Sequence, residues 1–494
     1  MFLRGQKSLT QRRARYYNVV DTNTDGGRGA VIRQVWFLEG FTMSIQNEYL
    51  SGLMERVVRR NPAEPEFHQA VQEVLTSLVP VVEAKPEYIK EGVMDCLVEP
   101  ERIIKFRVPW EDDQGNIHVN RGFRVQFNSA IGPYKGGLRF HPSVYEGIIK
   151  FLGFEQIFKN SLTGLPIGGG KGGADFDPAG KSDAEIMRFC QAYMQALYRY
   201  IGPDVDVPAG DMGVGGREIG YLFGEYRRLK GAWEKGVLTG KGFSYGGSLI
   251  RPEATGYGAV YYLQNVLEHE GERIAGKTIA CAGFGNVTWG ICKKATHLGA
   301  KVVTLSGPDG YIYDPDGVAT EEKIAYLVEM RSSGRNRVQD YAEKFGVEFF
   351  PGEKPWGVKA DVVMPSAMQN DVHMEQAKQI AANGVKYYIE VANMPTTNDA
   401  LRFLMEQPGM IVAPSKAVNA GGVATSALEM AQNSERLVWT AEEVDAQLHR
   451  IMNTIYQMSV DAAAEYGLGY NLVAGANIAG FKRVAEAMME QGVF

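Results

Sequence analysis

The segment TIACAGFGNVT (residues 278–288) decides the fold more than any other part of the sequence. A short apolar run leads directly into the turn GFGNVT (283–288), and the residues after it have the pattern of a helix followed by another strand. In a strand-turn-helix unit of this order, glycines let the backbone come close to a pyrophosphate at the helix N-terminus. A merely structural glycine turn would look similar, and Thr288 stands where Gly or Ala is usual. The context favours a dinucleotide site.

Further short apolar runs alternate with helical segments, which indicates a mainly parallel α/β sheet. Each run ends in small or polar residues, and this end of the strands is where an open parallel sheet binds its ligand. The runs are KTIACAG (277–283), AKVVTLSG (300–307), ADVVMPSA (360–367), VKYYIEVAN (385–393) and GMIVAPSK (409–416). The second half of the chain is therefore predicted to be a Rossmann-like dinucleotide-binding domain.

The first half of the chain has a mixed α and β pattern. Apolar residues recur at helical spacing over residues 43–80, and RIIKFRVPW (102–110) and HVNRGFRVQF (118–127) are typical of strands. The stretch GKGFSYGGSLIRP (240–252) is rich in Gly, Ser and basic residues, as linkers are, so we place a hinge near Gly246. The predicted fold class is α/β, with an N-terminal α/β domain and a second domain built on the mainly parallel sheet.

The bulk composition excludes several classes of protein. With 494 residues, 45% of them hydrophobic and 22% charged, the chain is a globular protein large enough for about two domains. Its formal net charge of −6 lacks the basic excess that binding to nucleic acid requires. No run of about 18 apolar residues suggests a membrane span. Four scattered cysteines without zinc-ligand spacing predict no metal site and a reducing, cytoplasmic location.

Residues 1–42 form an N-terminal extension of unknown role. Residues 1–20 contain five basic residues and no acid, a composition that resembles a transit peptide. Alternatively, the start codon has been placed too far upstream, because an amphipathic helix would begin well at Met43. The sequence leaves both interpretations open.

The end of the second predicted strand bears on the choice between NAD and NADP. An acid that binds the adenosine ribose is expected about 20 residues after the glycine turn. Ser306 stands there instead, and Asp309 follows three positions later. No Lys or Arg lies in this loop to receive a 2′-phosphate. We therefore expect NAD in preference to NADP.

Three lysines within 37 positions form a candidate anion-binding group. Lys135 and Lys171 are surrounded by glycines, which suits a backbone that packs closely around a buried ligand. Gln156 and Lys159 are three residues apart on a predicted helix, so both can reach one anion from the same face.

Asp211 lies in the Pro- and Gly-rich stretch DVDVPAGDMGVGGREIG (204–220), just before a predicted helix. A carboxylate at such a place is often a helix N-cap. Beside a group of lysines it is also a candidate proton carrier, because its surroundings can tune its pKa. The residues alone support both interpretations.

Several longer motifs point to one family. They are GPYKGGLRFHPSV (132–144), LPIGGGKGGADFDP (165–178), DVPAGDMGVG (206–215), RPEATGYG (251–258), GFGNV (283–287) and NAGGVATSALEMAQNSER (419–436). From about Met43 to the C-terminus the sequence resembles the glutamate, leucine, phenylalanine and valine dehydrogenase family, and within it the hexameric glutamate dehydrogenases of clostridial type. The motifs follow the family's order, which makes the resemblance specific.

The resemblance implies roles for individual residues. Lys171 and Asp211 would be the catalytic pair. The substrate would be bound through its side-chain carboxylate by Lys135 and Ser426, and through its α-carboxylate by Gln156, Lys159 and the backbone at Gly210. The cofactor would be bound by Thr255, Gly283, Phe284, Gly285, Asn286, Val287 and Asn393.

The resemblance also implies the reaction and the organisation of the chain. The reaction would be the reversible oxidative deamination of L-glutamate to 2-oxoglutarate and ammonium, with hydride transfer to NAD or NADP. A substrate-binding and oligomerisation domain would cover residues 43–246 and a dinucleotide-binding domain residues 247–469. The segment 470–494 would return to the substrate domain, and six copies would form a homohexamer.

Two other functions remain to be weighed. A dehydrogenase for branched-chain or aromatic amino acids would share the fold, but Lys135 and Ser426 would then leave a cation and a hydroxyl unmatched against an apolar substrate. A non-catalytic dinucleotide-binding protein would be expected to lack the catalytic pair, whereas Lys171 and Asp211 are both present.

Overall fold

The computed structural model describes residues 15–20, 32–37, 45–332 and 337–492. Most of the extension, and with it the transit-peptide and start-site interpretations, lies outside the described residues. Within it, β1 (Arg15–Val20) pairs antiparallel with β2 (Ile32–Phe37). The predicted helix start at Met43 is wrong, because α1 (Glu48–Arg60) begins only after Asn47. The Asn47 side chain accepts a hydrogen bond from the backbone N–H of Leu50 and so caps the first turn.

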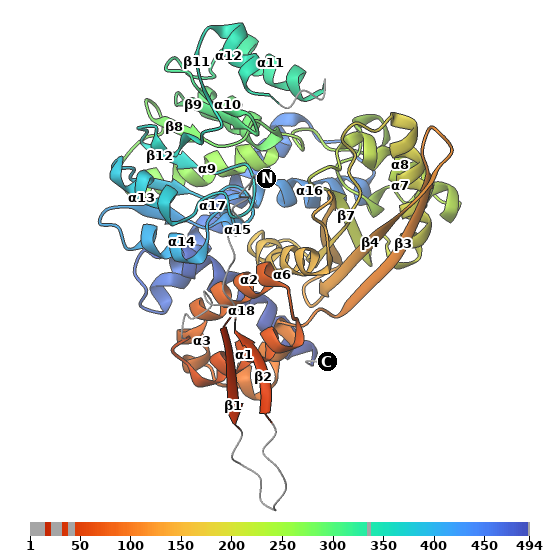
Figure 1. The fold of residues 1–494 in the computed structure, drawn as a ribbon, viewed down its shortest axis with the longest axis vertical. Helices are drawn as coiled ribbons and strands as arrows, with labels where there is room; N and C mark the ends of the chain where they lie inside the picture. The colour runs from red at the N-terminus through yellow and green to blue at the C-terminus, as the bar shows by residue number, and fades with distance from the viewer. Residues whose placement is uncertain (1–14, 21–31, 38–44, 333–336, 493–494) are drawn as a thin grey trace, which may run out of the picture.

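The first lobe of the molecule is built on a mixed sheet with the strand order β3-β4-β6-β5-β7 (Figure 1). Its strands are β3 (Arg102–Glu111), β4 (Ile117–Asn128), β5 (Tyr134–Phe140), β6 (Gly168–Ala174) and β7 (Asp206–Gly210). Strand β4 pairs antiparallel with β3 and β6, whereas β5 is parallel to both β6 and β7. The two strands predicted from residues 102–127 are confirmed.

The glycine-rich segments around Lys135 and Lys171 form strands. They form β5 and β6 in the middle of the sheet, where α6 (Glu146–Leu162) covers one face. A Cβ atom on Gly169 would lie 2.7 Å from the Ile157 side chain of this helix. Glycine is therefore required for α6 to approach the sheet closely.

Helices cover both faces of this sheet. Helix α6 packs on one face together with the N-terminal helices, while α7 and α8 cover the other face around a cluster of Phe and Tyr side chains. The helices of this half of the chain are α2 (Pro65–Ser77), α3 (Val79–Ala84), α4 (Glu87–Lys90), α5 (Val93–Leu97), α7 (Asp183–Leu197) and α8 (Gly216–Lys230).

The second lobe contains a larger sheet with the strand order β11-β10-β9-β8-β12-β13-β14. Its strands are β8 (Thr278–Cys281), β9 (Lys301–Gly307), β10 (Gly310–Tyr313), β11 (Glu348–Pro351), β12 (Val362–Met364), β13 (Tyr387–Ile389) and β14 (Ile411–Ala413). Strands β9, β8, β12, β13 and β14 are parallel, which confirms the five predicted runs. Strands β10 and β11 form an antiparallel edge that was not predicted.

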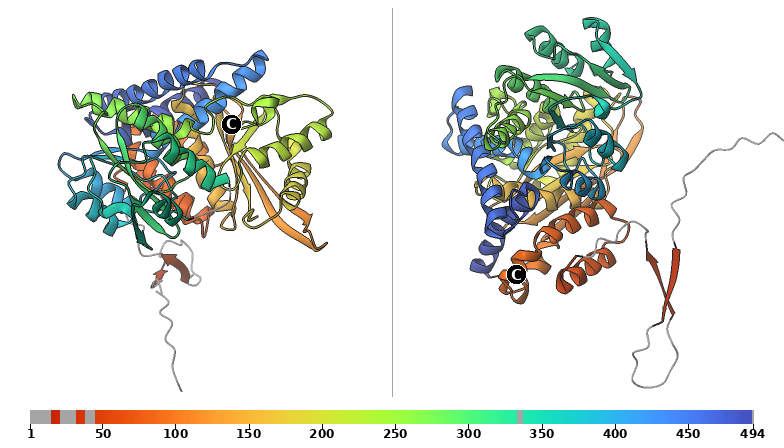
Figure 2. Two further views of the ribbon diagram at one scale, coloured as in Figure 1. Left: turned by 90° about the horizontal axis from the view of Figure 1, so that it is seen from above. Right: turned by 90° about the vertical axis from the view of Figure 1, so that its left-hand side faces the viewer.

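The last helices of the chain connect the two lobes. Helices α17 and α18 run along one side of the molecule (Figure 2), and α18 packs against α2 and α6 of the first lobe. Ser161 on α6 donates a hydrogen bond of 2.8 Å to the carbonyl of Gly480 on α18. The helices of this half are α9 (Ala254–His269), α10 (Asn286–His297), α11 (Glu321–Ser332), α12 (Gln339–Phe345), α13 (Met374–Ala382), α14 (Asn398–Met405), α15 (Ser415–Val418), α16 (Gly421–Glu435), α17 (Ala441–Glu465) and α18 (Leu472–Gln491).

In the part of the chain that the structure describes, no helix combines the length and apolar character needed to cross a membrane. Within the same residues, no cluster of His, Cys, Asp and Glu side chains is arranged to hold a metal ion.

Candidate active site

Lys171 and Asp211 meet between the two lobes. Lys171 lies on β6 and Asp211 directly follows β7, and the Lys171 Nζ is 3.2 Å from the Asp211 Oδ2. Arg139, on the intervening strand β5, donates from Nε to the same oxygen at 3.0 Å. Asp211 is not a helix cap, since the N-cap of α8 is Gly215. The capping interpretation of Asp211 is therefore wrong, because the carboxylate bonds to side chains of the sheet.

The charges around this pair shift its protonation equilibria. Burial would raise the pKa of Asp211, but the charges of Lys171 and Arg139 outweigh it and hold that pKa well below its usual range. Burial lowers the pKa of Lys171, although the Asp211 carboxylate opposes this shift. Burial and the nearby Lys171 charge lower the pKa of Lys159 to about 7. Lys159 and Lys171 can thus release protons more readily than surface lysines.

Lys135 is enclosed by the first lobe. Its side chain on β5 is fully buried, and Nζ donates to the Val207 carbonyl at 3.1 Å and to Thr239 Oγ1 at 2.7 Å. Burial and the nearby charge of Arg251 lower its pKa well below the usual value. A buried cation of this kind is costly unless an anion compensates it. Lys135 is therefore suited to bind a substrate carboxylate.

Ser426 lies on α16, which stands between the two sheets (Figure 1). Its hydroxyl oxygen accepts a hydrogen bond of 2.7 Å from Arg251 Nε. Because the charge of Arg251 also acts on Lys135, one guanidinium links the two residues expected at the substrate's side-chain carboxylate.

The residues expected at the α-carboxylate come from α6 and from the end of β7. Lys159 Nζ donates to Asn393 Oδ1 of the second lobe at 2.7 Å. The side chain of Gln156 donates to Asn160 on the same helix at 2.6 Å. Gly210 is the last residue of β7 and precedes Asp211. The structure therefore brings Lys159, expected at the substrate, together with Asn393, expected at the cofactor.

The glycine turn after β8 has the shape that a dinucleotide site requires. Gly283 adopts a left-handed conformation (φ 83°), and a Cβ atom there would lie 3.3 Å from the backbone of Ala367. Its N–H donates to Ser306 Oγ at 2.8 Å. Helix α10 then begins at Asn286, after Gly285 at its N-cap. Thr288 is fully buried and hydrogen-bonded to the Ala282 carbonyl, so its replacement of Gly or Ala fits the turn.

Other residues complete the surroundings of the turn. Thr255 lies on α9 directly against Gly422 of α16, where a Cβ atom would collide with its hydroxyl group. Phe284 is buried beside Gly307, and Val287 packs partly buried against the core. Asp309 accepts hydrogen bonds from the backbone N–H groups of Val338 and Gln339 at 3.1 and 3.0 Å. Its negative charge is thus fixed near the end of β9.

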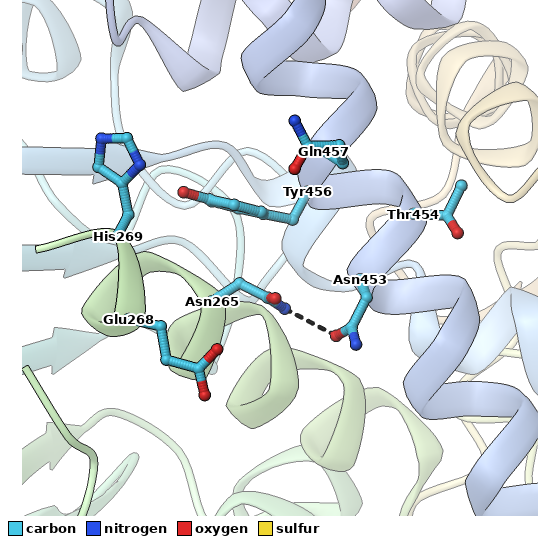
Figure 3. Close-up of a pocket in the computed structure, with 7 residues that line it drawn as sticks. All are labelled: Asn265, Glu268, His269, Asn453, Thr454, Tyr456 and Gln457. Carbon is cyan, nitrogen blue, oxygen red and sulfur yellow. Dashed lines mark hydrogen bonds between the residues drawn. The ribbon is translucent and has the colours of Figure 1, made fainter. Parts of the chain in front are cut away.

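A separate hollow of about 430 Å³ opens between α9 and α17 (Figure 3). Glu268 and His269 contribute a carboxylate and an imidazole to its lining, and the amide of Asn265 donates to Asn453 at 2.9 Å across it. The hollow is lined by Asn265, Glu268, His269, Asn453, Thr454, Tyr456 and Gln457, without a lysine or arginine. It does not suit a dicarboxylate, so the candidate active site remains between the lobes.

Two family models match most of the described chain. The model described as Glutamate/Leucine/Phenylalanine/Valine dehydrogenase matches residues 246–492, and that described as Glu/Leu/Phe/Val dehydrogenase, dimerisation domain, matches residues 100–228. The chain belongs to the glutamate, leucine, phenylalanine and valine dehydrogenase family. The family and the two-domain α/β fold predicted from the sequence are thereby confirmed.

Similar members of the family carry names that specify a reaction and a cofactor. The chain is 67% identical over 447 residues to a protein of Clostridium symbiosum named NAD-specific glutamate dehydrogenase, covering 90% of this chain and 99% of that protein. It is 56% identical over 446 residues to the NADP-specific glutamate dehydrogenase of Haemophilus influenzae, with 90% and 99% covered. A solved structure named glutamate dehydrogenase superposes with a TM-score of 0.89 at 67% identity, covering 90% of this chain and 100% of that one.

Several polar residues at the site were not predicted from the sequence. Arg139 and Arg251 lie within the family motifs at residues 132–144 and 251–258, and Thr239 lies just before the predicted linker. Asn419 donates to Asn393 Oδ1 at 3.0 Å, while its own Oδ1 is buried and accepts no hydrogen bond from the described residues. An arginine inside a Gly- or Pro-flanked motif was the available signal for the first two.

Proposed function

We propose that this chain is a glutamate dehydrogenase, which interconverts L-glutamate and 2-oxoglutarate plus ammonium with NAD or NADP. One observation carries the proposal: the buried cation Lys135 and the pair Lys171–Asp211 project from one sheet, with Lys159 on the helix that covers it. Separate cations of this kind suit a substrate with two carboxylates. The names of the similar proteins support the same reaction.

The two ends of the substrate are assigned to two groups of residues. Lys135 and Ser426 bind the side-chain carboxylate, and the Arg251 guanidinium bonded to Ser426 adds positive charge there. Thr239 orients the Lys135 ammonium by accepting its hydrogen bond. An apolar side chain would leave these groups unmatched at considerable cost, which favours glutamate over leucine, valine or phenylalanine.

The other end of the substrate lies between α6 and β7. Lys159, Gln156 and the backbone at Gly210 bind the α-carboxylate. Two fixed ends orient Cα so that its hydrogen can be transferred, because the reacting atoms are then held close together. When bound, NAD or NADP supplies the hydride acceptor at its nicotinamide ring.

Lys171 and Asp211 handle protons. Oxidation of the substrate leaves an iminium carbon, and neutral Lys171 takes a proton from the water that attacks this carbon. Its lowered pKa makes the neutral form accessible. Asp211 then exchanges protons with the nitrogen that leaves as ammonia. At this stage the proton taken by Lys171 has restored its positive charge, which together with that of Arg139 keeps the pKa of Asp211 low and favours transfer of a proton from Asp211 to the nitrogen.

The cofactor is assigned to the carboxyl end of the second sheet. The turn Gly283–Val287 and the start of α10 accept the pyrophosphate, a fit that the left-handed Gly283 supports. We also assign Thr255 and Asn393 to this site. The buried Asn419 Oδ1, which accepts no hydrogen bond from the described residues, is available to an amide donor. The fixed carboxylate of Asp309 favours NAD, because it would repel the 2′-phosphate of NADP.

We assign residues 43–246 to substrate binding and oligomerisation, 247–469 to dinucleotide binding, and 470–494 to a segment that returns to the first domain. Contacts of α18 with α2 and α6 support this division. The match of residues 100–228 to a dimerisation-domain model supports oligomer formation, for which we propose a homohexamer. We also propose a cytoplasmic location.

The test is a set of initial rates on the purified chain. Amination of 2-oxoglutarate with ammonium is measured with NADH and with NADPH, beside the 2-oxo acids of leucine, valine and phenylalanine. We expect turnover of 2-oxoglutarate to exceed that of the apolar acids by at least about 100-fold. A preference for an apolar acid would identify another specificity within the family, and loss of all turnover would identify a non-catalytic protein.

A further inference from the structure

Arg139 contacts both lobes of the molecule at once. Its side chain extends from β5 and is 7% exposed. Nε donates to Asp211 Oδ2 in the first lobe at 3.0 Å, and Nη1 donates to Gln369 Oε1 in the second lobe at 3.2 Å. Gln369 lies in the segment between β12 and α13. One guanidinium therefore joins the proposed proton carrier to the opposite lobe.

The shape of the guanidinium makes these two contacts interdependent. Its N–H donors lie in one plane with fixed directions, so holding Nη1 also sets the direction of Nε. Lys171 contacts the same carboxylate oxygen, Oδ2, at 3.2 Å. Among the described residues, neither cation donates a hydrogen bond to Oδ1. With Oδ2 occupied twice, Oδ1 is the oxygen left to exchange a proton with the substrate.

We propose that Arg139 is a positioning residue that aligns Asp211 for proton transfer when the lobes are together, with Gln369 as the residue that completes this alignment. The inference rests on the proposed function of Asp211. Separation of the lobes removes Gln369 from Nη1, and Arg139 is then free to turn about its own side-chain bonds. Asp211 loses its fixed orientation until the lobes meet again.

A neighbouring contact between the lobes provides a control. Asn370, next to Gln369, exchanges two hydrogen bonds of 3.2 Å with Gln69 on α2. This contact holds the same segment of the second lobe to the first lobe, but through α2 instead of the sheet. Gln69→Ala therefore weakens the association of the lobes without changing the partners of Asp211.

The charges that face Asp211 determine how its pKa, and with it the pH dependence of activity, changes when Arg139 is replaced. They are Arg139 from β5, Lys171 from β6, Lys159 from α6 and Arg251 from the segment before α9. Arg139 and Lys171 are in direct contact with the carboxylate. Removal of the Arg139 charge raises the pKa of Asp211, so the acid limb of the activity profile moves to higher pH.

The experiment compares full-length wild-type chain with Arg139→Met, Arg139→Lys, Gln369→Ala, Gln69→Ala and the double variant Arg139→Lys/Gln369→Ala. For each, kcat and kcat/KM for glutamate oxidation are measured over the active pH range, together with NADH affinity and the thermal midpoint. Wild-type turnover is measured first, because its absence would refute the proposed function itself and not only the role of Arg139.

We expect Arg139→Met to lower kcat by about tenfold or more and to move the acid limb upward by at least about half a pH unit. Arg139→Lys keeps the charge, so its acid limb should coincide with that of the wild type while kcat still falls. Gln369→Ala should lower kcat when Arg139 is present. It should cause little further loss in the Arg139→Lys background, because the lysine ammonium lacks the planar set of N–H donors that Gln369 orients.

Three results would each overturn the proposal in an active enzyme. The first is an acid limb that does not move in Arg139→Met, and the second is a loss of kcat in the double variant equal to the product of the losses in the two single variants. The third is a shift of the acid limb in Gln69→Ala as large as that in Arg139→Met. If Arg139→Met does not fold, the proposal is tested by Arg139→Lys, Gln369→Ala and their double variant alone. Losses of kcat that multiply in the double variant refute the proposal, whereas little further loss beyond Arg139→Lys supports it.

Discussion

Lys171 and Asp211 stand 3.2 Å apart although β5 separates the strands that carry them. Arg139 of the intervening strand contacts the same oxygen of Asp211, so a carboxylate and two cations form one unit. The side chain of Lys171 is 4% exposed and that of Asp211 is 21% exposed. The acid therefore keeps limited access to the space between the lobes, whereas the lysine is enclosed. This arrangement brings the proposed base, Lys171, and the proposed proton carrier, Asp211, into contact.

Asp211→Asn tests the proton carrier. An amide cannot exchange protons near neutral pH, so kcat should fall by at least about 100-fold. NADH affinity and the thermal midpoint should change little, because Asp211 caps no helix. The matched control is Asp183→Asn, which changes an aspartate that is 73% exposed. Turnover within about fivefold of wild type, with deamidation excluded by mass spectrometry, would contradict the assignment.

Lys135→Leu tests the side-chain subsite. The change removes a fully buried cation that we assign to the substrate's side-chain carboxylate, so kcat/KM for glutamate should fall by at least about 100-fold. Activity on leucine or norvaline should become measurable. Lys105→Leu, at a lysine that is 54% exposed on β3, is the control for the substitution itself. Near-normal glutamate kinetics in a folded Lys135→Leu variant would exclude Lys135 from the pocket.

The pKa of Lys159, lowered to about 7, predicts how binding of dicarboxylates depends on pH. The ammonium form binds the anion, and this form is lost as the pH rises through 7. The inhibition constant of glutarate, a non-reacting dicarboxylate, should therefore rise between about pH 7 and pH 9 by up to about tenfold per unit.

Lys159→Arg separates Lys159 from the other buried lysines. Arginine stays protonated throughout this range, so the variant should lose the rise in the inhibition constant that Lys159 causes. An inhibition constant that does not change with pH in the wild type would refute the prediction. The same pH dependence in both proteins would assign it to Lys135 or Lys171 instead.

Cofactor preference tests the role of Asp309. NADH should have the higher kcat/KM, because the Val338 and Gln339 amides fix the Asp309 charge near the end of β9. Asp309→Asn, which removes the charge with little change in size, should reduce the discrimination against NADPH severalfold. A tenfold or greater preference of the wild type for NADPH would contradict the prediction. Cations from another part of the fold would then reach the ribose.

The sequence by itself determined the α/β class, the parallel strands of the second sheet and the family. These depend on short-range patterns: apolar runs of strand length, a glycine turn between strand and helix, and motifs in a fixed order. The same patterns also contain the candidate residues Lys135, Lys159, Lys171 and Asp211, whose contacts agree with a common site. Such features can be recognised locally because the backbone conformation of a few residues decides them.

Only the tertiary structure decided which charges meet. Arg139 lies 72 positions from Asp211 and 230 from Gln369, and Arg251 lies 175 positions from Ser426, so no local pattern reports these contacts. The glycines around the buried lysines lie in paired strands against which α6 packs closely, whereas the sequence suggested only a close approach to a ligand. Strands β10 and β11 escaped prediction because they lie outside the alternation of parallel strands and helices: β10 pairs antiparallel with β9, and β11 pairs with β10 at the edge of the sheet. The order of strands and the packing of helices on them bring these groups together, and both arise from contacts between residues far apart in the chain.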